Sequence, residues 1–372
     1  MTRRTEGGHR GILTTVGYFF TDRDKLEPAA VTVLAALFAV AAGICLIFLV
    51  SKQPVQSMRN FLLGPVLRTY NFYYLLVVMV PLTFTGLAMC IIYSLRYMSL
   101  IIDASFYFGA VIATAIGTSI ALPAGVHPAV AMRAAGCAGG LIGTLPAVLR
   151  LKWRANELVS SLMLNYIFFF TGSFIILYFF RDRSQTIFAS LPFLKTFALP
   201  KLVPSTQLHA GLPIALAFIV LVSLFLYRTR WGLEIRLTGA NPKFAAYAGI
   251  SVARVAVYAH FIAGFLGGVG GAVEMSGLYR SFIWQMDPSY AMDGVIIAML
   301  ARKNPKFVSV SAFFIAWLRV GADFMSRRGD VAFEFITLLQ GSIILILASD
   351  KIVNSFKESR LRRAALRAEA AR

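Results

Sequence analysis

The stretch YRTRWGLEIRLTGANPKFAAYAGI, from Tyr227 to Ile250, is a polar and basic island between two long apolar runs. It holds a single acidic residue, Glu234, and its basic residues are Arg228, Arg230, Arg236 and Lys243. Loops with this charge between membrane spans lie in the cytoplasm under the positive-inside rule. Gly239 and Pro242 mark a turn, after which small residues follow on a short helix. The stretch therefore predicts a span on either side and a cytoplasmic loop that docks on a soluble protein.

The composition requires a membrane. Of 372 residues, 58% are hydrophobic and only 14% are charged, and the mean hydropathy is +0.72. One soluble core cannot bury so much apolar surface, so we expect an integral protein of the lipid bilayer. The net charge of +19 also suits a nucleic-acid-binding protein, but the cations lie at the ends of apolar runs. Membrane orientation explains them better, and we expect no nucleic-acid partner.

The apolar runs predict an all-α polytopic membrane protein with about ten transmembrane helices and both termini in the cytoplasm. The expected spans are residues 28–50, 71–94, 99–122, 128–149, 158–180, 211–227, 252–273, 291–301, 306–325 and 332–349. They form one transmembrane domain, residues 28–349, between a cytoplasmic N-terminal segment, 1–27, and a basic cytoplasmic tail, 350–372. Within this domain we expect an interfacial helix at 52–70, an outer loop at 181–209 and the cytoplasmic loop at 228–250.

Polar groups inside the apolar runs are candidates for a solute pathway, because a charge near the bilayer centre costs roughly 2.5 to 3.5 kcal/mol. Asp103 and Asn165 need partners that lipid does not offer, and aromatic residues beside Asp103 can stack on a planar ring. The predicted pathway residues are Asp103, Ser105, Phe106, Tyr107, Asn165 and Glu274. The alternative is that the rings fill space between helices and that Asp103 pairs with a cation such as Arg319.

Other ionisable residues in the later spans are Asp293, Arg319, Asp323 and Glu334. Arg319 and Asp323 are four residues apart on one expected helix, so their spacing predicts an ion pair. Small residues four apart predict close helix packing, in the pairs Gly136 with Gly140, Gly139 with Gly143, Gly264 with Gly268, and Gly267 with Gly271.

Motifs for chemistry are missing from the sequence. It holds no G-x-x-x-x-G-K-[ST], H-E-x-x-H or G-x-S-x-G motif and no paired metal-ligand spacing. We therefore expect no catalytic residue, no metal and no cofactor in this chain, and a transport subunit rather than an enzyme.

Three blocks of sequence carry a resemblance to a known family. They are TRWGLEIRLTGANPKFAAYAGI (Thr229–Ile250), WRANELVSSLMLNYI (Trp153–Ile167) and HFIAGFLGGVGGAVEMSGLYR (His260–Arg280). In this order they resemble permease subunits of ABC importers of the branched-chain amino acid, ribose and nucleoside class, closest to the nucleoside or riboflavin branch. The first block is similar to the coupling loop of that family. On that loop the resemblance implies ATPase contacts for Arg236, Gly239, Asn241, Pro242, Ala245, Ala246, Tyr247 and Gly249.

The resemblance also implies a function and partners. The chain would form half of a translocation pathway with a second, similar permease subunit in a bacterial cytoplasmic (inner) membrane. Cytoplasmic ATPase subunits would bind the ATP, and an extracytoplasmic binding protein would deliver the solute.

The cargo implied by the resemblance is a small aromatic, hydroxyl-bearing solute such as a nucleoside or riboflavin. The stretch IIDASFYFGAV, Ile101–Val111, departs from the NxGxEGQ-like run of nucleoside permeases, so branched-chain amino acids and sugars stay open. Alternatives from other classes are a secondary transporter driven by an ion gradient through Asp103 or Glu274 and, more remotely, a membrane-embedded enzyme.

Overall fold

The computed structural model describes residues 41, 47–48, 51–184, 188–328, 337–338 and 341. The chain divides into two units, Met1–Leu49 with Thr337–Arg372, and Val50–Ile336. Nearly all described residues belong to the second unit. The expected first and last spans lie almost entirely outside the described residues, as do both terminal segments and Glu334.

The second unit is built of helices, with no strand in its described part beyond two isolated bridges. The α-helices are α3 (Pro54–Leu63), α4 (Thr69–Ser94), α5 (Ile102–Ser119), α6 (Val126–Trp153), α7 (Glu157–Ile175), α8 (Gly211–Arg228), α9 (Arg230–Ala240), α10 (Pro242–Tyr247), α11 (Val252–Gly277), α12 (Tyr290–Leu300) and α13 (Val308–Arg328). A π-helical turn, Ile176–Phe180, extends α7, and 3₁₀ turns lie at Lys195–Phe197 and Pro305–Phe307.

Seven helical segments of the described chain are long and apolar enough to cross a membrane. They are Thr69–Ser94, Ile102–Ser119, Val126–Trp153, Glu157–Phe180, Gly211–Arg228, Val252–Gly277 and Pro305–Arg327. The apolar helix α12 is shorter. The prediction of an all-α, multi-pass membrane protein is confirmed, whereas the count of about ten spans and the side of the termini stay predictions.

The most intimate helix contact joins α6 to α11, where glycines meet backbone to backbone. A Cβ at Gly139 would lie 2.6 Å from the Gly264 carbonyl oxygen and 2.9 Å from the Gly268 Cα. One turn along, a Cβ at Gly143 would lie 2.7 Å from the His260 carbonyl oxygen. The close packing predicted at these glycines is therefore observed, although the sequence did not say which helices meet.

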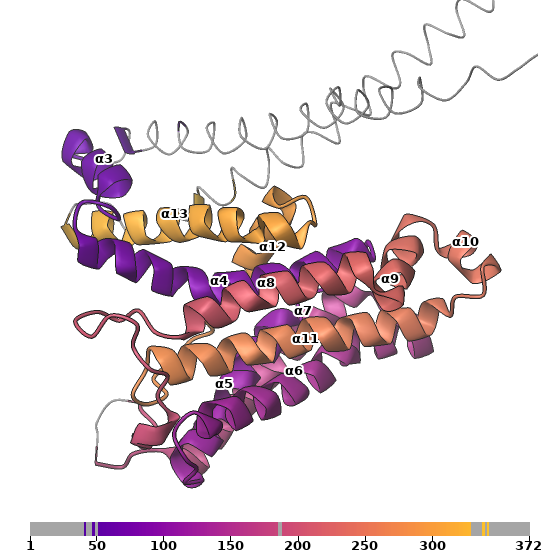
Figure 1. Cartoon of the computed structure of the whole chain (residues 1–372), viewed down its shortest axis with the longest axis horizontal. Coiled ribbons are helices and arrows are strands. Elements are labelled where there is room, and N and C mark those ends of the chain that lie inside the picture. Colours follow the sequence, from indigo (N-terminus) through magenta and orange to yellow (C-terminus); the bar gives the residue numbers. More distant parts are fainter. Residues whose placement is uncertain are drawn as a thin grey trace, which may run out of the picture. The chain divides into compact units, whose positions relative to one another are not determined.

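Burial separates a central helix from a peripheral one. The most apolar window of α4 is 89% buried, because α4 packs against α8, α11, α12 and α13. The corresponding window of α7 is only 11% buried, so its apolar side chains face outward. Helices α9 and α10 lie beyond one end of the bundle (Figure 1), called here the α9–α10 end.

The segment that follows α7 covers the opposite end of the bundle. The Leu194 N–H donates to the Gly117 carbonyl of α5 at 2.9 Å, and the Leu199 N–H donates to the Ser276 carbonyl of α11 at 2.8 Å. Between them Phe197 is fully buried. The described part of this segment therefore packs against the bundle, and its predicted outer location stays a prediction.

Candidate functional site

Helix α5 begins deep inside the bundle rather than at its end. Helix α4 ends at Ser94, yet α5 starts only at Ile102, and the linker 95–101 between them is not helical. Ile102 packs beside Gly267, which lies 15 residues after the start of α11, or roughly 22 Å along its axis. Helix α5 is therefore shorter than the span expected at 99–122. Irregular backbone precedes the end of α5 that lies inside the bundle.

The peripheral helix α7 supplies the hydrogen bonds that this irregular backbone needs. Asn165 Nδ2 donates to the Leu100 carbonyl at 2.9 Å, and its Oδ1 accepts from the Ala104 N–H at 3.2 Å. Ser161 Oγ accepts from the Leu100 N–H at 3.1 Å. The residue preceding α5, Ile101, has no capping side chain. Asn165 thus caps α5 from another helix, in a place where lipid offers no partner.

A second helix, α12, also begins inside the bundle. Gly294 in its second turn packs on the backbone of Thr85, which lies 16 residues after the start of α4, or roughly 24 Å along it. The Ala291 N–H at its start donates to Asp103 Oδ1 at 2.7 Å. The carboxylate lies in the first turn of α5 and beside the first turn of α12, so both positive helix ends stabilise it.

Arg319 connects α13 to the start of α12. Its Nε lies 2.8 Å from Asp293 Oδ2, its Nη2 donates to the Pro288 carbonyl at 3.3 Å, and its guanidinium lies 4.7 Å from the centre of the Tyr290 ring. The predicted Arg319–Asp323 pair is wrong. Asp323 instead pairs with Arg327 at 2.7 Å, because a partner on a packed helix is closer to Arg319 than its own neighbour four residues on.

Aromatic rings surround the meeting point of α5 and α12. Phe106 stacks on Trp284 with ring centres 6.0 Å apart and meets the edge of Tyr290 at 5.1 Å. Tyr107 meets Phe282 at 5.7 Å, and its hydroxyl lies 2.8 Å from the hydroxyl of Ser173. Phe282 and Trp284, in the stretch between α11 and α12, therefore fold inward onto α5.

The basic stretch that opened the sequence forms two short, capped helices. Thr229 accepts the Gly232 N–H at 3.1 Å to cap α9, and Asn241 accepts the Lys243 and Phe244 N–H groups at 3.1 Å to cap α10. Tyr247 at the end of α10 is 91% exposed. The stretch thus presents a capped, polar hairpin at one end of the bundle.

Helix α9 packs tightly on the end of α4. A Cβ at Gly239 would collide with the carbonyl oxygen of Ser94, and Ser94 is the residue just before the linker 95–101. Tyr258 of α11 donates its hydroxyl to Glu234 Oε2 at 3.0 Å, which ties α9 to α11 as well. Helix α9 is therefore in direct contact both with the residue before the linker and with α11.

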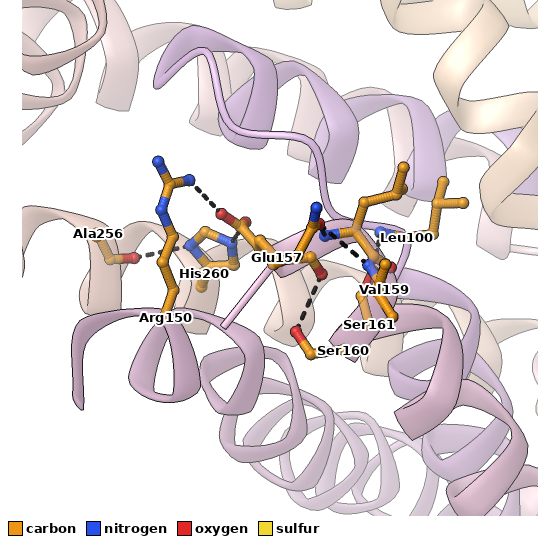
Figure 2. Close-up of polar contacts among 10 residues, drawn as sticks. Leu100, Arg150, Glu157, Val159, Ser160, Ser161, Ala256 and His260 are labelled. Atoms are coloured by element: carbon orange, nitrogen blue, oxygen red, sulfur yellow. Dashed lines mark hydrogen bonds and ion pairs between the residues drawn. The ribbon is translucent and has the colours of Figure 1, made fainter. Parts of the chain in front are cut away.

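Beside the linker lies a polar cluster in which the buried side chains of Glu157 and His260 meet the partly exposed Arg150. Figure 2 shows Glu157 between its two partners, with Oε2 2.7 Å from Arg150 Nη1 and Oε1 2.7 Å from His260 Nε2. His260 Nδ1 lies 2.9 Å from the Ala256 carbonyl oxygen. Because a carbonyl only accepts, Nδ1 carries a proton, and one further proton lies between Nε2 and Glu157. Arg150 also lies 4.0 Å over the ring of Tyr97 in the linker.

Comparisons with known proteins agree with this architecture. The family model "Branched-chain amino acid transport system / permease component" matches residues 71–348. The chain belongs to this family. No solved structure matches it.

Named relatives of the permease are also transport proteins. A guanosine ABC transporter permease protein of Bacillus subtilis is 27% identical over 332 residues, covering 87% of this chain and 94% of the relative. A glucose ABC transporter permease protein of Haloferax volcanii is 26% identical over 335 residues, covering 87% and 88%. A probable riboflavin import permease protein of Treponema pallidum is 23% identical over 224 residues, covering 59% and 58%. The permease is thus a transport subunit of an ABC importer and not an enzyme.

The structure brings together only some of the predicted pathway residues. Asp103, Phe106 and Glu274 surround the start of α12, through Ala291 and Tyr290. The other three have partners elsewhere, as described for Asn165 and Tyr107, while Ser105 donates to the Gly139 carbonyl of α6 at 3.0 Å. All except Asn165 are buried within the permease, and their role in transport stays a prediction.

Several residues near these features were not among the predicted site residues. Phe244 is exposed on α10 one turn before Tyr247, and only its aromatic spacing on a polar loop signalled it. Among the residues expected on the docking face, Ala245 is fully buried, whereas Ala246 is exposed. For the Arg150–Glu157–His260 cluster, the sequence shows only that an acid and a histidine each lie next to an apolar run. Their contact across 103 positions was not visible in the sequence.

Proposed function

We propose that this permease imports a nucleoside or a related aromatic, hydroxyl-bearing solute such as riboflavin, using ATP hydrolysed by a separate ATPase subunit. The relative that carries the cargo proposal is the guanosine permease, because the match extends over 94% of its length. The rings of Phe106, Trp284 and Tyr290 around Asp103 suit such a cargo, since aromatic side chains stack on planar bases and a carboxylate accepts from sugar hydroxyls.

The observation that carries the ATP-driven mechanism is the hairpin of α9 and α10. It is capped at both helix starts, basic, and carries exposed side chains such as Tyr247 at one end of the bundle. We place this hairpin in the cytoplasm, against the ATPase, with Ala246, Tyr247 and Phe244 at the contact. The positive-inside rule supports that orientation, which also places both termini of the proposed ten-helix chain in the cytoplasm of a bacterium.

The hairpin acts on the pathway through the linker 95–101. A push on α9 moves Gly239 against Ser94, and the linker passes the displacement to α5, whose first turn is held by Asn165 and whose Asp103 holds α12. The two helices that begin inside the bundle are the moving parts. Broken helices near the bilayer centre are the usual position of transporter binding sites.

Partners complete the proposed importer. The buried positions of Asp103, Phe106 and Glu274 mean that a pathway past them opens only when the helices move. We propose that a second, similar permease subunit forms the other half of the pathway and that a binding protein delivers cargo at the end opposite α9 and α10. ATP is the partner's ligand, and this chain needs no cofactor of its own.

The glucose relative supports a second candidate cargo. The match covers 88% of the glucose permease protein at 26% identity. A sugar offers hydroxyl groups like those on the ribose of a nucleoside. A sugar lacks the planar ring, so the aromatic residues beside Asp103 favour the nucleoside.

Uptake measurements distinguish these cargoes. Vesicles containing the permease with its co-purified ATPase and binding protein are loaded with ATP and given labelled guanosine, riboflavin, glucose or leucine. The proposal expects ATP-dependent accumulation of guanosine or riboflavin at a fixed membrane potential. Accumulation of glucose or leucine alone overturns the cargo, and accumulation that follows an ion gradient without ATP overturns the mechanism.

Labelling tests the orientation. Single cysteines replace Ser184 and Ser251 in a variant that lacks the native thiols Cys45, Cys90 and Cys137. An impermeant thiol reagent should label Ser184→Cys from outside and Ser251→Cys only after the membrane is opened. Labelling of both from the same side contradicts the proposed topology.

A further inference from the structure

An open pocket lies at the α9–α10 end of the bundle, where the linker after α4 meets the end of α6 and the start of α7. Its volume is about 430 Å³, and sites for small ligands usually measure roughly 300 to 1,000 Å³. It is lined by Arg96 and Met98 of the linker 95–101, by Arg150 of α6, and by residues 155–158 at the start of α7. None of the predicted pathway residues lines it, so the pocket is separate from the proposed cargo pathway.

Positive charge gathers at this pocket. Arg96 and Arg150 line it, Lys152 and Arg154 follow at the end of α6, and all four residues are exposed. The acid in the lining is Glu157, and both of its carboxylate oxygens are already engaged in the polar cluster of Figure 2. Arg96 forms no ion pair with any residue that the structure describes. The pocket therefore attracts an anion.

The end of α6 marks the level of the lipid headgroups. Trp153, its last residue, is 69% exposed, and the Lys152 ammonium lies 5.9 Å over the Trp153 ring. Exposed tryptophan at the end of a span sits at the membrane–water interface, and lysine and arginine side chains near helix ends extend to the same level. A pocket beside these residues is therefore within reach of lipid phosphate groups.

An uncovered apolar surface begins at the rim of the pocket and continues along α7. Leu158, Val159, Leu162 and Met163 are between 38% and 59% exposed. Residues four apart share a helix face, so these four side chains form a continuous stripe. A soluble anion would bind the arginines and leave the stripe uncovered. A phospholipid brings a phosphate for the arginines and acyl chains for the stripe.

We propose that the pocket binds the headgroup of an anionic phospholipid, such as phosphatidylglycerol, with Arg96 and Arg150 at the phosphate and the acyl chains along α7. Basic pockets between transmembrane helices bind anionic headgroups in other membrane proteins. The guanidinium group suits this ligand, because its paired N–H donors match the geometry of a phosphate.

The position of Arg150 gives the lipid a structural role. Arg150 lies 4.0 Å over the ring of Tyr97 in the linker 95–101 and 2.7 Å from Glu157 at the start of α7. A headgroup held by Arg96 and Arg150 therefore contacts the linker, α6 and α7 together. Bound lipid should stabilise this junction and raise the Tm of the chain.

Native mass spectrometry of the full chain released from lipid nanodiscs tests the binding. The discs contain phosphatidylcholine with a rising fraction of phosphatidylglycerol, and the lipids retained by each chain are counted. The wild type should retain phosphatidylglycerol in preference to phosphatidylcholine. Arg96→Gln should need roughly five-fold more phosphatidylglycerol for the same retention, as expected for the loss of one cation near a headgroup. Arg254→Gln removes the same charge at the start of α11, outside the pocket, and should behave as wild type.

Thermal unfolding in the same discs distinguishes a lipid from a soluble anion. A ligand that binds the folded state raises the Tm by mass action. Phosphatidylglycerol should therefore raise the wild-type Tm, and the rise should be smaller in Arg96→Gln than in Arg254→Gln. Inorganic phosphate, added to discs of phosphatidylcholine alone at constant ionic strength, should not reproduce the rise.

Four results overturn the proposal. Equal retention of the two lipids by the wild type is the first, and it needs no variant. The second is the same lipid retention by Arg96→Gln and Arg254→Gln. A rise of Tm in inorganic phosphate that equals the rise in phosphatidylglycerol would assign the pocket to soluble anions. Release of paired chains without lipid would assign the α7 stripe to a second copy. No cargo or ATPase is present in either assay, so failure here leaves the proposed import untouched.

Discussion

Asp103 and Ala291 join two helices that both begin inside the bundle, with the carboxylate Oδ1 2.7 Å from the amide nitrogen across 188 positions of sequence. Neither helix has a capping side chain of its own at this end. One carboxylate therefore stabilises the positive ends of both α5 and α12. The two helices cannot move apart without breaking this hydrogen bond.

Substitutions at Asp103 separate its bond from its charge. Asp103→Ala leaves the buried Ala291 N–H unpaired and should lower the free energy of unfolding by roughly 1 to 3 kcal/mol. Asp103→Asn keeps an accepting oxygen and should retain most of the stability while lowering uptake through loss of the charge. Thermal unfolding and cargo uptake are measured on the same preparations, with Asp182→Asn in the loop after α7 as control. Normal uptake by Asp103→Asn would assign the residue to packing alone.

Asn165 is expected to matter for folding through bonds outside its own helix. Asn165→Ala removes the partners of the Leu100 carbonyl and the Ala104 N–H and should cost roughly 1 to 3 kcal/mol of unfolding free energy for each group left unpaired. Asn165→Asp still accepts but sets a carboxylate oxygen against the Leu100 carbonyl, so it should cost at least as much as Asn165→Ala. Thr171→Val on the same helix is the control, because Thr171 bonds only within α7. Equal Tm values for Asn165→Ala and the control would refute the cap.

How much of this arrangement the sequence reveals depends on whether the signal is local. The polar island at Tyr227–Ile250 and the glycines four apart depend on neighbouring residues, so the polar hairpin and close packing at these glycines were predictable, although not which helices meet. A break between the spans ending at 94 and starting at 99 was also predictable, but not that α5 begins only at Ile102, inside the bundle. What prevents a helix there is the set of bonds from Asn165 and Ser161, 61 to 65 residues away.

The candidate site shows the same limit. Asp103 and Glu274 were recognisable as polar groups among apolar residues, but their partners lie on other elements. Arg319 illustrates this, since its spacing favoured Asp323 while the fold supplies Asp293. Ala245 was expected on a docking face because it is small, whereas in the structure it is buried beneath α10.

Gly239 and Gly249 offer a matched pair of glycines in the hairpin. Gly239→Ala drives a methyl group into the Ser94 carbonyl and should push α9 away from the linker. Gly249→Ala meets open space and only strains a backbone with φ +80°, which costs about 1 to 2 kcal/mol locally. Hydrogen exchange should accelerate in residues 95–101 for Gly239→Ala but not for Gly249→Ala. Identical exchange in the two variants would contradict the transmission through Ser94.

His209 should make stability depend on pH. Burial lowers its pKa from 6.5 to about 4. Between pH 6.5 and 4, His209 is therefore protonated in the unfolded chain but neutral in the folded chain. The free energy of unfolding should therefore fall as the pH drops from about 6.5 to 4, by about 3 kcal/mol in total, and this contribution should be constant above and below that window.

The comparison for His209 is a variant without the titrating ring. His209 lines one cavity together with Glu274, Tyr74 and Tyr279, which are also titratable. The contribution of His209 is therefore taken as the difference between wild type and His209→Gln. That variant keeps an oxygen able to accept the Gly211 N–H. If the two proteins lose stability in parallel between pH 6.5 and 4, His209 is not the group responsible.

The central claim is that α9 and α10 couple an ATPase to transport. Ala246 is exposed on α10 between Phe244 and Tyr247, so Ala246→Trp adds bulk to the proposed contact without entering the core. The direct measurement is the amount of cargo imported per ATP hydrolysed by the assembled importer. The account predicts that Ala246→Trp inserts and folds as wild type does while this ratio falls at least several-fold. A ratio equal to that of the wild type, in a protein assembled to the same level, would contradict it.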